Sequence, residues 1–216
     1  MSHADPLFDD VPDRRGRSTL KWGKYDGRDI LPLWVADMDF RSPPEVIAAA
    51  EEAASHGIYG YGKASPELPR LIVERMAKLH DWEIEPSWLV WLPGMVCAFN
   101  VACRMTAKPG DDILSNVPVY PPFLSAPGHS GQNLVQVPMS LEGERHVMDF
   151  DALEDAVTPR SRGFLLCHPH NPVGTRFSRP ELERFAEYAL RKDLTVCSDE
   201  IHCDLLLEKG ASHLPL

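Results

Sequence analysis

Short apolar runs alternate with amphipathic stretches along most of the chain. Segments with strand character lie at 88–92, 112–116, 134–137, 163–167 and 194–198, with a further candidate at 203–207. Several are separated by stretches of helical periodicity, near 95–107, 150–157 and 178–191. Strands that alternate with helices form a mainly parallel sheet with helices on both faces. The predicted fold class is therefore α/β.

Helix start and stop signals mark the boundaries. Prolines at 43 and 44 follow Ser42 and open a helix over 45–56 that ends at Gly57, and a second helix runs from Ser65 to about residue 80. A serine and a glutamate three positions apart, Ser178 and Glu181, form a capping box. Before residue 43 the chain is rich in turn residues. We predict an N-terminal arm over 1–42 and an incomplete sheet domain over 43–216.

Two adjacent acids, Asp199 and Glu200, follow the strand predicted at 194–198. Ligands bind at the carboxyl ends of the strands in open α/β sheets. An acid buried there is costly unless a cation or strong donor meets it. The protonated nitrogen of a pyridine ring would be such a partner. The alternative is a pair of acids on an exposed turn.

Residues of different chemical kinds follow three further predicted strands. Gly94, Met95 and Val96 form a strand–glycine–helix junction whose first N–H groups suit a phosphate. Tyr120 could stack on a flat ligand or plug the sheet, and Asn171 could donate to a phenolate oxygen or form an Asx-turn. Together with the acid they match pyridoxal 5'-phosphate. A carboxylate keeps its ring nitrogen protonated, which makes the cofactor an electron sink.

Composition narrows the class of protein. The 216 residues are 44% hydrophobic, with a net charge of −10 and no basic stripe, so we expect no nucleic-acid partner. No apolar run approaches a membrane span, and the N-terminus lacks the pattern of a signal peptide. The five cysteines are scattered, which is typical of reduced thiols in the cytoplasm. Nicotinamide-binding, P-loop and nucleophile-elbow fingerprints are missing from the sequence.

Six segments, at 33–40, 56–61, 91–96, 118–123, 169–174 and 198–202, stand in the order found in a known family. The chain resembles the fold-type I pyridoxal-phosphate enzymes of aminotransferase class I/II. More narrowly, it is similar to their cystathionine β-lyase or C–S lyase branch. Position 168 is His where this family commonly has Asn.

The resemblance implies a role for each matching residue. Met95 and Val96, after Gly94, would hold the phosphate, and Tyr120 would stack on the ring. The remaining roles would be Asn171 at the 3′-oxygen, Asp199 at the ring nitrogen, His202 near the cofactor, Ala36 and Asp37 beside the substrate, and Tyr61 at the phosphate of a dimer partner.

The resemblance also implies a lysine that holds the cofactor as a Schiff base. In the family it follows the Asp-Glu pair by roughly thirty residues, and this sequence has no residue there. Lys209 comes too early. We therefore expect a chain truncated before the last strands and the C-terminal small domain, unless a separate chain completes it.

The implied reaction is cleavage of the Cβ–S bond of cystathionine or a related sulfur-containing amino acid, giving pyruvate, ammonia and a thiol. An aminotransferase would use the same cofactor contacts. A third possibility is a catalytically inactive remnant or regulatory piece. A metal site is also conceivable, although its residues lack metal-binding spacing: Cys167, His168, His170, His202 and Cys203.

Overall fold

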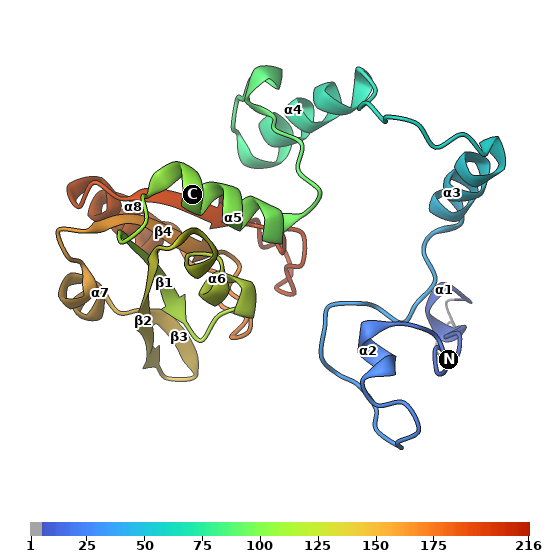
Figure 1. Ribbon diagram of the computed structural model, residues 1–216, viewed down its shortest axis with the longest axis horizontal. Helices are drawn as coiled ribbons and strands as arrows, with labels where there is room; N and C mark the ends of the chain where they lie inside the picture. Colours follow the sequence, from blue (N-terminus) through green and yellow to red (C-terminus); the bar gives the residue numbers. More distant parts are fainter. Residues whose placement is uncertain (1–5) are drawn as a thin grey trace. The chain divides into compact units, whose positions relative to one another are not determined.

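The computed structural model describes residues 6–216, and the chain forms two compact units, Met1–Lys63 and Ala64–Leu216 (Figure 1). The helices of the first unit are α1 (Pro6–Asp9), α2 (Leu20–Gly23) and α3 (Pro44–His56). Those of the second are α4 (Glu67–His80), η1 (Pro86–Trp88), α5 (Met95–Thr106), α6 (Pro121–Ser125), η2 (Gly128–Ser130), α7 (Phe150–Ala156) and α8 (Arg179–Arg191). The predicted division between an arm at 1–42 and a sheet domain at 43–216 stays a prediction.

A five-stranded sheet forms the centre of the second unit. Its strands are β1 (Asp112–Val117), β2 (Asn133–Glu142), β3 (Arg145–Met148), β4 (Ser161–Cys167) and β5 (Thr195–Asp199), in the order β3-β2-β1-β4-β5. The pairs β1–β2, β1–β4 and β4–β5 are parallel, and β2–β3 is an antiparallel hairpin. The predicted mainly parallel α/β sheet is confirmed.

Alternate side chains of the central strands enter two separate cores. On one face, Ile113 and Leu165 pack with buried side chains of α5 and α6. On the other, Leu114 and Phe164 pack with side chains of α7 and α8. Successive strand residues point to opposite faces of the sheet. Because helices cover both faces, both sets of side chains are apolar. The prediction of helices on both faces is confirmed.

The predicted helix signals lie where the helices begin and end. The N–H of Ser178 donates to Glu181 Oε2 at 2.7 Å at the start of α8. Gly57 adopts φ +68° after α3, a left-handed conformation that glycine tolerates without strain. These boundaries depend on neighbouring residues alone, which is why the sequence predicts them well.

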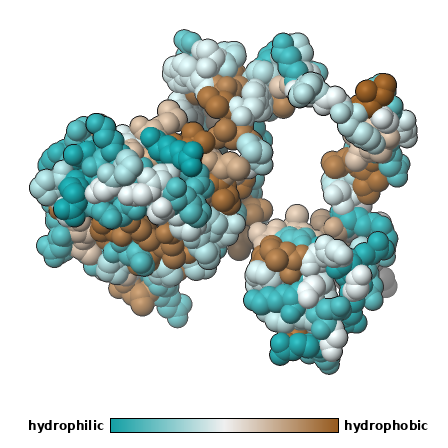
Figure 2. Space-filling model, viewed as in Figure 1, coloured by the Kyte–Doolittle hydropathy of each residue, from teal (hydrophilic) through white to brown (hydrophobic). Residues whose placement is uncertain are grey.

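Two predicted strands are wrong. Residues 88–92 contain the end of η1 and an unpaired stretch in which Val90 is 77% exposed. Residues 203–204 end a turn, in which Cys203 N–H donates to Glu200 O at 2.9 Å, and residues 205–207 are irregular, with Leu207 fully exposed. An apolar run becomes a strand only beside a partner, and neither segment pairs with β1–β5. Hydrophobic residues also reach the surface of each unit (Figure 2).

The short strand β3 was not predicted. It pairs with β2 through a two-residue turn in which Gly143 has φ +64°. Its four residues carry too little apolar periodicity to stand out in the sequence. Over residues 6–216, every helix is too short or too polar to cross a lipid bilayer.

Candidate functional site

Asp199, the last residue of β5, is a buried acid with few partners. Its side chain follows Cys197 on the face of the sheet that α5 covers, since residues two apart share a face. The residue is 4% exposed, and in the described part of the chain one hydrogen bond reaches its carboxylate, from Ile201 N–H at 3.1 Å. Burial raises the pKa of Asp199 above its usual value. The site therefore suits a ligand group that carries a proton or a positive charge.

The ends of β1, β4 and β5 meet around this acid. Cys167, at the end of β4, is the register partner of Asp199. The N–H of Asn171 donates to Cys167 Sγ at 3.3 Å, and Tyr120 N–H donates to Asn171 O at 3.1 Å. The tertiary structure thus brings Tyr120, Asn171 and Asp199 to neighbouring strand ends. Their contacts with a cofactor stay predictions.

His170 joins two of these loops. It is 2% exposed, and its ring nitrogens lie 2.8 Å from Pro118 O and 3.2 Å from Cys167 O. Burial lowers its pKa, and a neutral ring has one N–H, so it donates to one carbonyl at a time. The sequence suggested this histidine only as a metal ligand. Its position next to Asn171 was the signal that could have identified a structural role.

The start of α5 lies on the same face as Asp199. Met95 packs against the cluster that contains Cys167 and Cys197. Gly94 precedes the helix with φ 155° and ψ 167°, a conformation largely restricted to glycine. Because the first N–H groups of a helix have no partner within it, Met95 and Val96 offer donors suited to a phosphate.

Replacing Gly94 by Ala is expected to lower the free energy of unfolding by about 1–3 kcal/mol, because a Cβ strains this backbone conformation. The measurement is urea unfolding of both chains. Gly128→Ala is the matched control, since Gly128 has no positive φ and its added Cβ would meet nothing within 4 Å. Equal stability of the Gly94→Ala variant and the parent would contradict this expectation.

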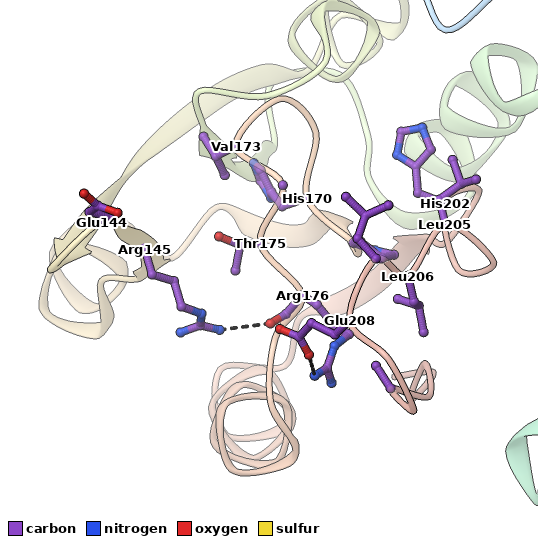
Figure 3. Close-up of a pocket in the computed structure, with 14 residues that line it drawn as sticks. Glu144, Arg145, His170, Val173, Thr175, Arg176, His202, Leu205, Leu206 and Glu208 are labelled. Carbon is purple, nitrogen blue, oxygen red and sulfur yellow. Dashed lines mark hydrogen bonds and ion pairs between the residues drawn. The ribbon is translucent and has the colours of Figure 1, made fainter. Parts of the chain in front are cut away.

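A cavity of about 500 Å³ opens beside these strand ends (Figure 3). His170 and His202 line one part of it, and Arg145 and Arg176 line another. Arg176 pairs with Glu208 at 3.0 Å. Among the predicted cofactor residues, His202 lines this cavity, whereas Tyr120, Asn171 and Asp199 do not. The cavity therefore adjoins the predicted site without coinciding with it.

The predicted substrate residues lie in the first unit. The two terminal guanidinium nitrogens of Arg14, Nη1 and Nη2, donate to the carboxylate of Asp37 at 2.9 and 2.7 Å, and this pairing lowers the pKa of Asp37. Ala36 is exposed, and Tyr61 is fully exposed. The roles of these three residues stay predictions.

Asp39 anchors the same segment, and the sequence reasoning missed it. Lys21 Nζ donates to it at 2.7 Å, Trp22 Nε1 at 2.8 Å and Arg14 at 2.7 Å. The Lys21 contact and the other donors lower the pKa of Asp39 to about 2. Val35, just upstream, has φ +67°, which is unusual for a β-branched residue.

The residues considered for a metal site do not form one. In the part of the chain from 6 to 216, no group of three His, Cys, Asp or Glu side chains is placed to hold a metal ion. Cys167 packs on the α5 side of the sheet, whereas His168 stacks on Phe177 of the other core at 5.5 Å. Burial also raises the pKa of the Cys167 thiol to about 11, which disfavours a thiolate ligand.

Lowering the pH from about 6.5 to about 4 is expected to destabilise the chain through His168. This ring is fully buried, and burial lowers its pKa to about 4. In that window the unfolded chain binds a proton that the folded chain excludes, so the free energy of unfolding decreases as the pH is lowered. The stability that the chain gains from keeping His168 neutral is at most about 3 kcal/mol. It is fully present above the pKa of the unfolded state, about 6.5, and is lost as the pH falls toward about 4.

Urea unfolding across this pH range tests the expectation. His168→Asn should flatten the curve between about pH 4 and 6.5. His129→Asn, at an exposed position, is the control and should keep the parental slope. A His168→Asn curve parallel to that of the parent would show that another group causes the loss.

Comparisons with known proteins agree with this arrangement. Residues 28–214 match the family described as "Aminotransferase class I and II". The chain is 36% identical to cystathionine beta-lyase PatB of Bacillus subtilis (strain 168), over 96% of this chain and 55% of that protein. It is 29% identical to the cystathionine beta-lyase of Corynebacterium glutamicum, over 93% of this chain and 53% of that protein.

Solved structures show the same fold. The crystal structure of OvoB matches with a TM-score of 0.91 and 46% identity, over 96% of this chain and 55% of that one. The pyridoxal-phosphate-bound C–S lyase of Staphylococcus hominis matches with a TM-score of 0.89 and 28% identity, over 98% and 55%. The chain spans about half the length of the curated relatives it matches.

Proposed function

Because the chain belongs to the aminotransferase class I and II family and has pyridoxal 5'-phosphate as its family cofactor, we propose that the whole protein is a C–S lyase. Its substrate would be cystathionine or a related sulfur-containing amino acid. The Cβ–S bond breaks, the sulfur leaves as a thiol, and uptake of water releases ammonia and pyruvate. The resemblance to cystathionine beta-lyases and C–S lyases supports this reaction over others of the family.

The buried carboxyl of Asp199 is the observation that carries the proposal. It lies at a strand end with a raised pKa and one hydrogen bond in the described residues. A protonated pyridine nitrogen would supply the missing partner, because an opposite charge favours the ionised carboxylate. Bound in this way, the cofactor supplies an electron sink for the substrate's Cα.

The other strand-end residues would orient the cofactor. Tyr120 would lie against the ring, and its backbone contact with Asn171 would keep the amide of Asn171 near the ring oxygen. The first N–H groups of α5, at Met95 and Val96, would bind the phosphate. His202 would border the site from the turn after β5.

The remaining parts of the site would come from elsewhere. Ala36 and Asp37 would contact the substrate, and the exposed ring of Tyr61 would reach the phosphate in the other subunit of a homodimer. The lysine that holds the cofactor and moves the proton at Cα is expected outside these 216 residues, since Lys209 lies exposed in a turn. The 216 residues alone would then have no turnover.

The reaction is tested on full-length protein supplied with L-cystathionine and cofactor. Pyruvate should accumulate without any added keto acid, and free thiol should appear in equal amount. An aminotransferase would instead require an acceptor such as 2-oxoglutarate. Strict dependence on that acceptor would replace the lyase proposal with the aminotransferase one.

A further inference from the structure

Glu200 follows Asp199 directly but takes no part in the predicted cofactor contacts. Its carboxylate lies on the side of the strand end where Ser198 is, and it accepts from the Ser198 hydroxyl at 2.7 Å. It also accepts from Leu216 N–H at 3.1 Å, and its other oxygen lies 2.8 Å from Nε2 of His213. Two of the three partners thus come from the segment 211–216, named here the C-terminal segment.

These contacts make Glu200 an ionised acceptor. Burial opposes its ionisation, yet the hydrogen bonds from His213, Leu216 and Ser198 hold its pKa below the usual value. A carboxylate has no proton to give, so Nε2 of His213 carries the hydrogen. The His213 side chain is 2% exposed, and a bond between such groups is of the stronger, charge-assisted kind.

His168 links the C-terminal segment back to Asp199. Its ring centroid lies 4.7 Å from that of His213, and its Nε2 lies 3.1 Å from Leu214 O. Its backbone N–H donates to Asp199 O at 2.9 Å. These contacts form a closed ring of interactions, from Asp199 through Glu200 and His213 to His168 and back to Asp199. The ring lies on the side of the sheet opposite α5.

Few contacts fix the orientation of the Asp199 carboxylate. The single hydrogen bond to its carboxylate comes from Ile201, inside the turn that Glu200 anchors. If that turn loosened, the carboxylate could rotate toward water, where hydration replaces the ligand as its partner. A hydrogen bond to a ring nitrogen depends strongly on direction, so it would weaken before any other interaction with the cofactor.

We propose that Glu200 and His213 are positioning residues that aim the Asp199 carboxylate at the ring nitrogen of the cofactor, an inference that rests on the proposed cofactor site. They act through the backbone turn after β5 and contact no reacting atom. Loss of either residue should weaken recognition of the ring nitrogen more than binding of the phosphate, because the phosphate donors lie at the start of α5, a separate element.

The test measures binding to the full-length protein, freed of its own cofactor, by calorimetry. One ligand is pyridoxamine 5'-phosphate, which has no aldehyde and so forms no imine with surface lysines. The other is its analogue with a C–H in place of the ring nitrogen. The ratio of the two dissociation constants is the ring-nitrogen preference, which a general loss of stability would not change.

We expect Glu200→Gln and His213→Leu to reduce this preference about tenfold, toward the value for Asp199→Asn. His213→Gln retains an N–H for Glu200 and should reduce it much less. Ser198→Ala, which removes one of the three hydrogen bonds, is a milder change for the case that Glu200→Gln does not fold.

Glu181→Gln is the matched control, because it breaks another low-pKa glutamate pair, with Arg145 at 2.7 Å, away from Asp199. It should lower stability without changing the preference. A preference unchanged in both His213→Leu and Ser198→Ala would overturn the positioning role. A parent chain that binds both ligands equally, or neither, would instead overturn the cofactor site itself and this inference with it.

Discussion

Asp199→Asn is expected to weaken binding of pyridoxamine 5'-phosphate about a hundredfold, because the amide carries no charge to pair with the protonated ring nitrogen. Removing one partner of a buried charge pair costs about 3–5 kcal/mol, and the low end of that range corresponds to a loss of roughly a hundredfold. Calorimetry on the full-length protein, freed of its own cofactor, measures the loss. Asp155→Asn, at an exposed position of α7, is the control and should bind like the parent.

The same substitution should stabilise the chain without ligand. Burial raises the pKa of Asp199, so the folded state holds the ionised carboxylate less well than the unfolded state does. Above the unfolded pKa this difference destabilises the fold, and an uncharged amide removes it. At pH 7 we expect weaker binding together with a higher free energy of unfolding. A variant with weaker binding and also a lower free energy of unfolding would indicate a structural role for the carboxylate.

Phe164→Ala should cause the largest loss of stability, about 3–5 kcal/mol, because it leaves a cavity in the core. Phe164 is 1% exposed on β4, and its ring packs edge-on against Phe185 of α8 at 4.9 Å. Urea unfolding measures the change. Leu190→Ala, at an α8 position that is 82% exposed, should change stability by less than about 0.5 kcal/mol. Similar losses in the two variants would contradict this assignment of the core.

The sequence predicted the strands that pair, but it could not show which apolar runs have a partner strand. The runs at 112–116 and 163–167 became β1 and β4 because both of their faces are covered. The run at 88–92 is equally apolar but pairs with no described strand. Periodicity reports the character of a segment and contains no information about whether a neighbour is present to bond with it.

The candidate site shows the same division. The residue types at Tyr120, Asn171 and Asp199 suggested a cofactor before any contact was known. Their convergence depends on the pairing of β1, β4 and β5 and on hydrogen bonds between loops distant in sequence. The anchoring of Glu200 by His213 was invisible in the sequence, since neither residue stands in a recognisable spacing with the other.

The sequence by itself determined the α/β class, most helix ends and the kinds of chemical group available at the strand ends. These follow from local physics, namely side-chain alternation, helix capping and the left-handed tolerance of glycine. Only the tertiary structure decided which runs pair, that Asp199 is buried beside Cys167, and that Glu200 binds the C-terminal segment. Those features depend on which distant groups share one desolvated space, and that is settled by packing across the whole sheet.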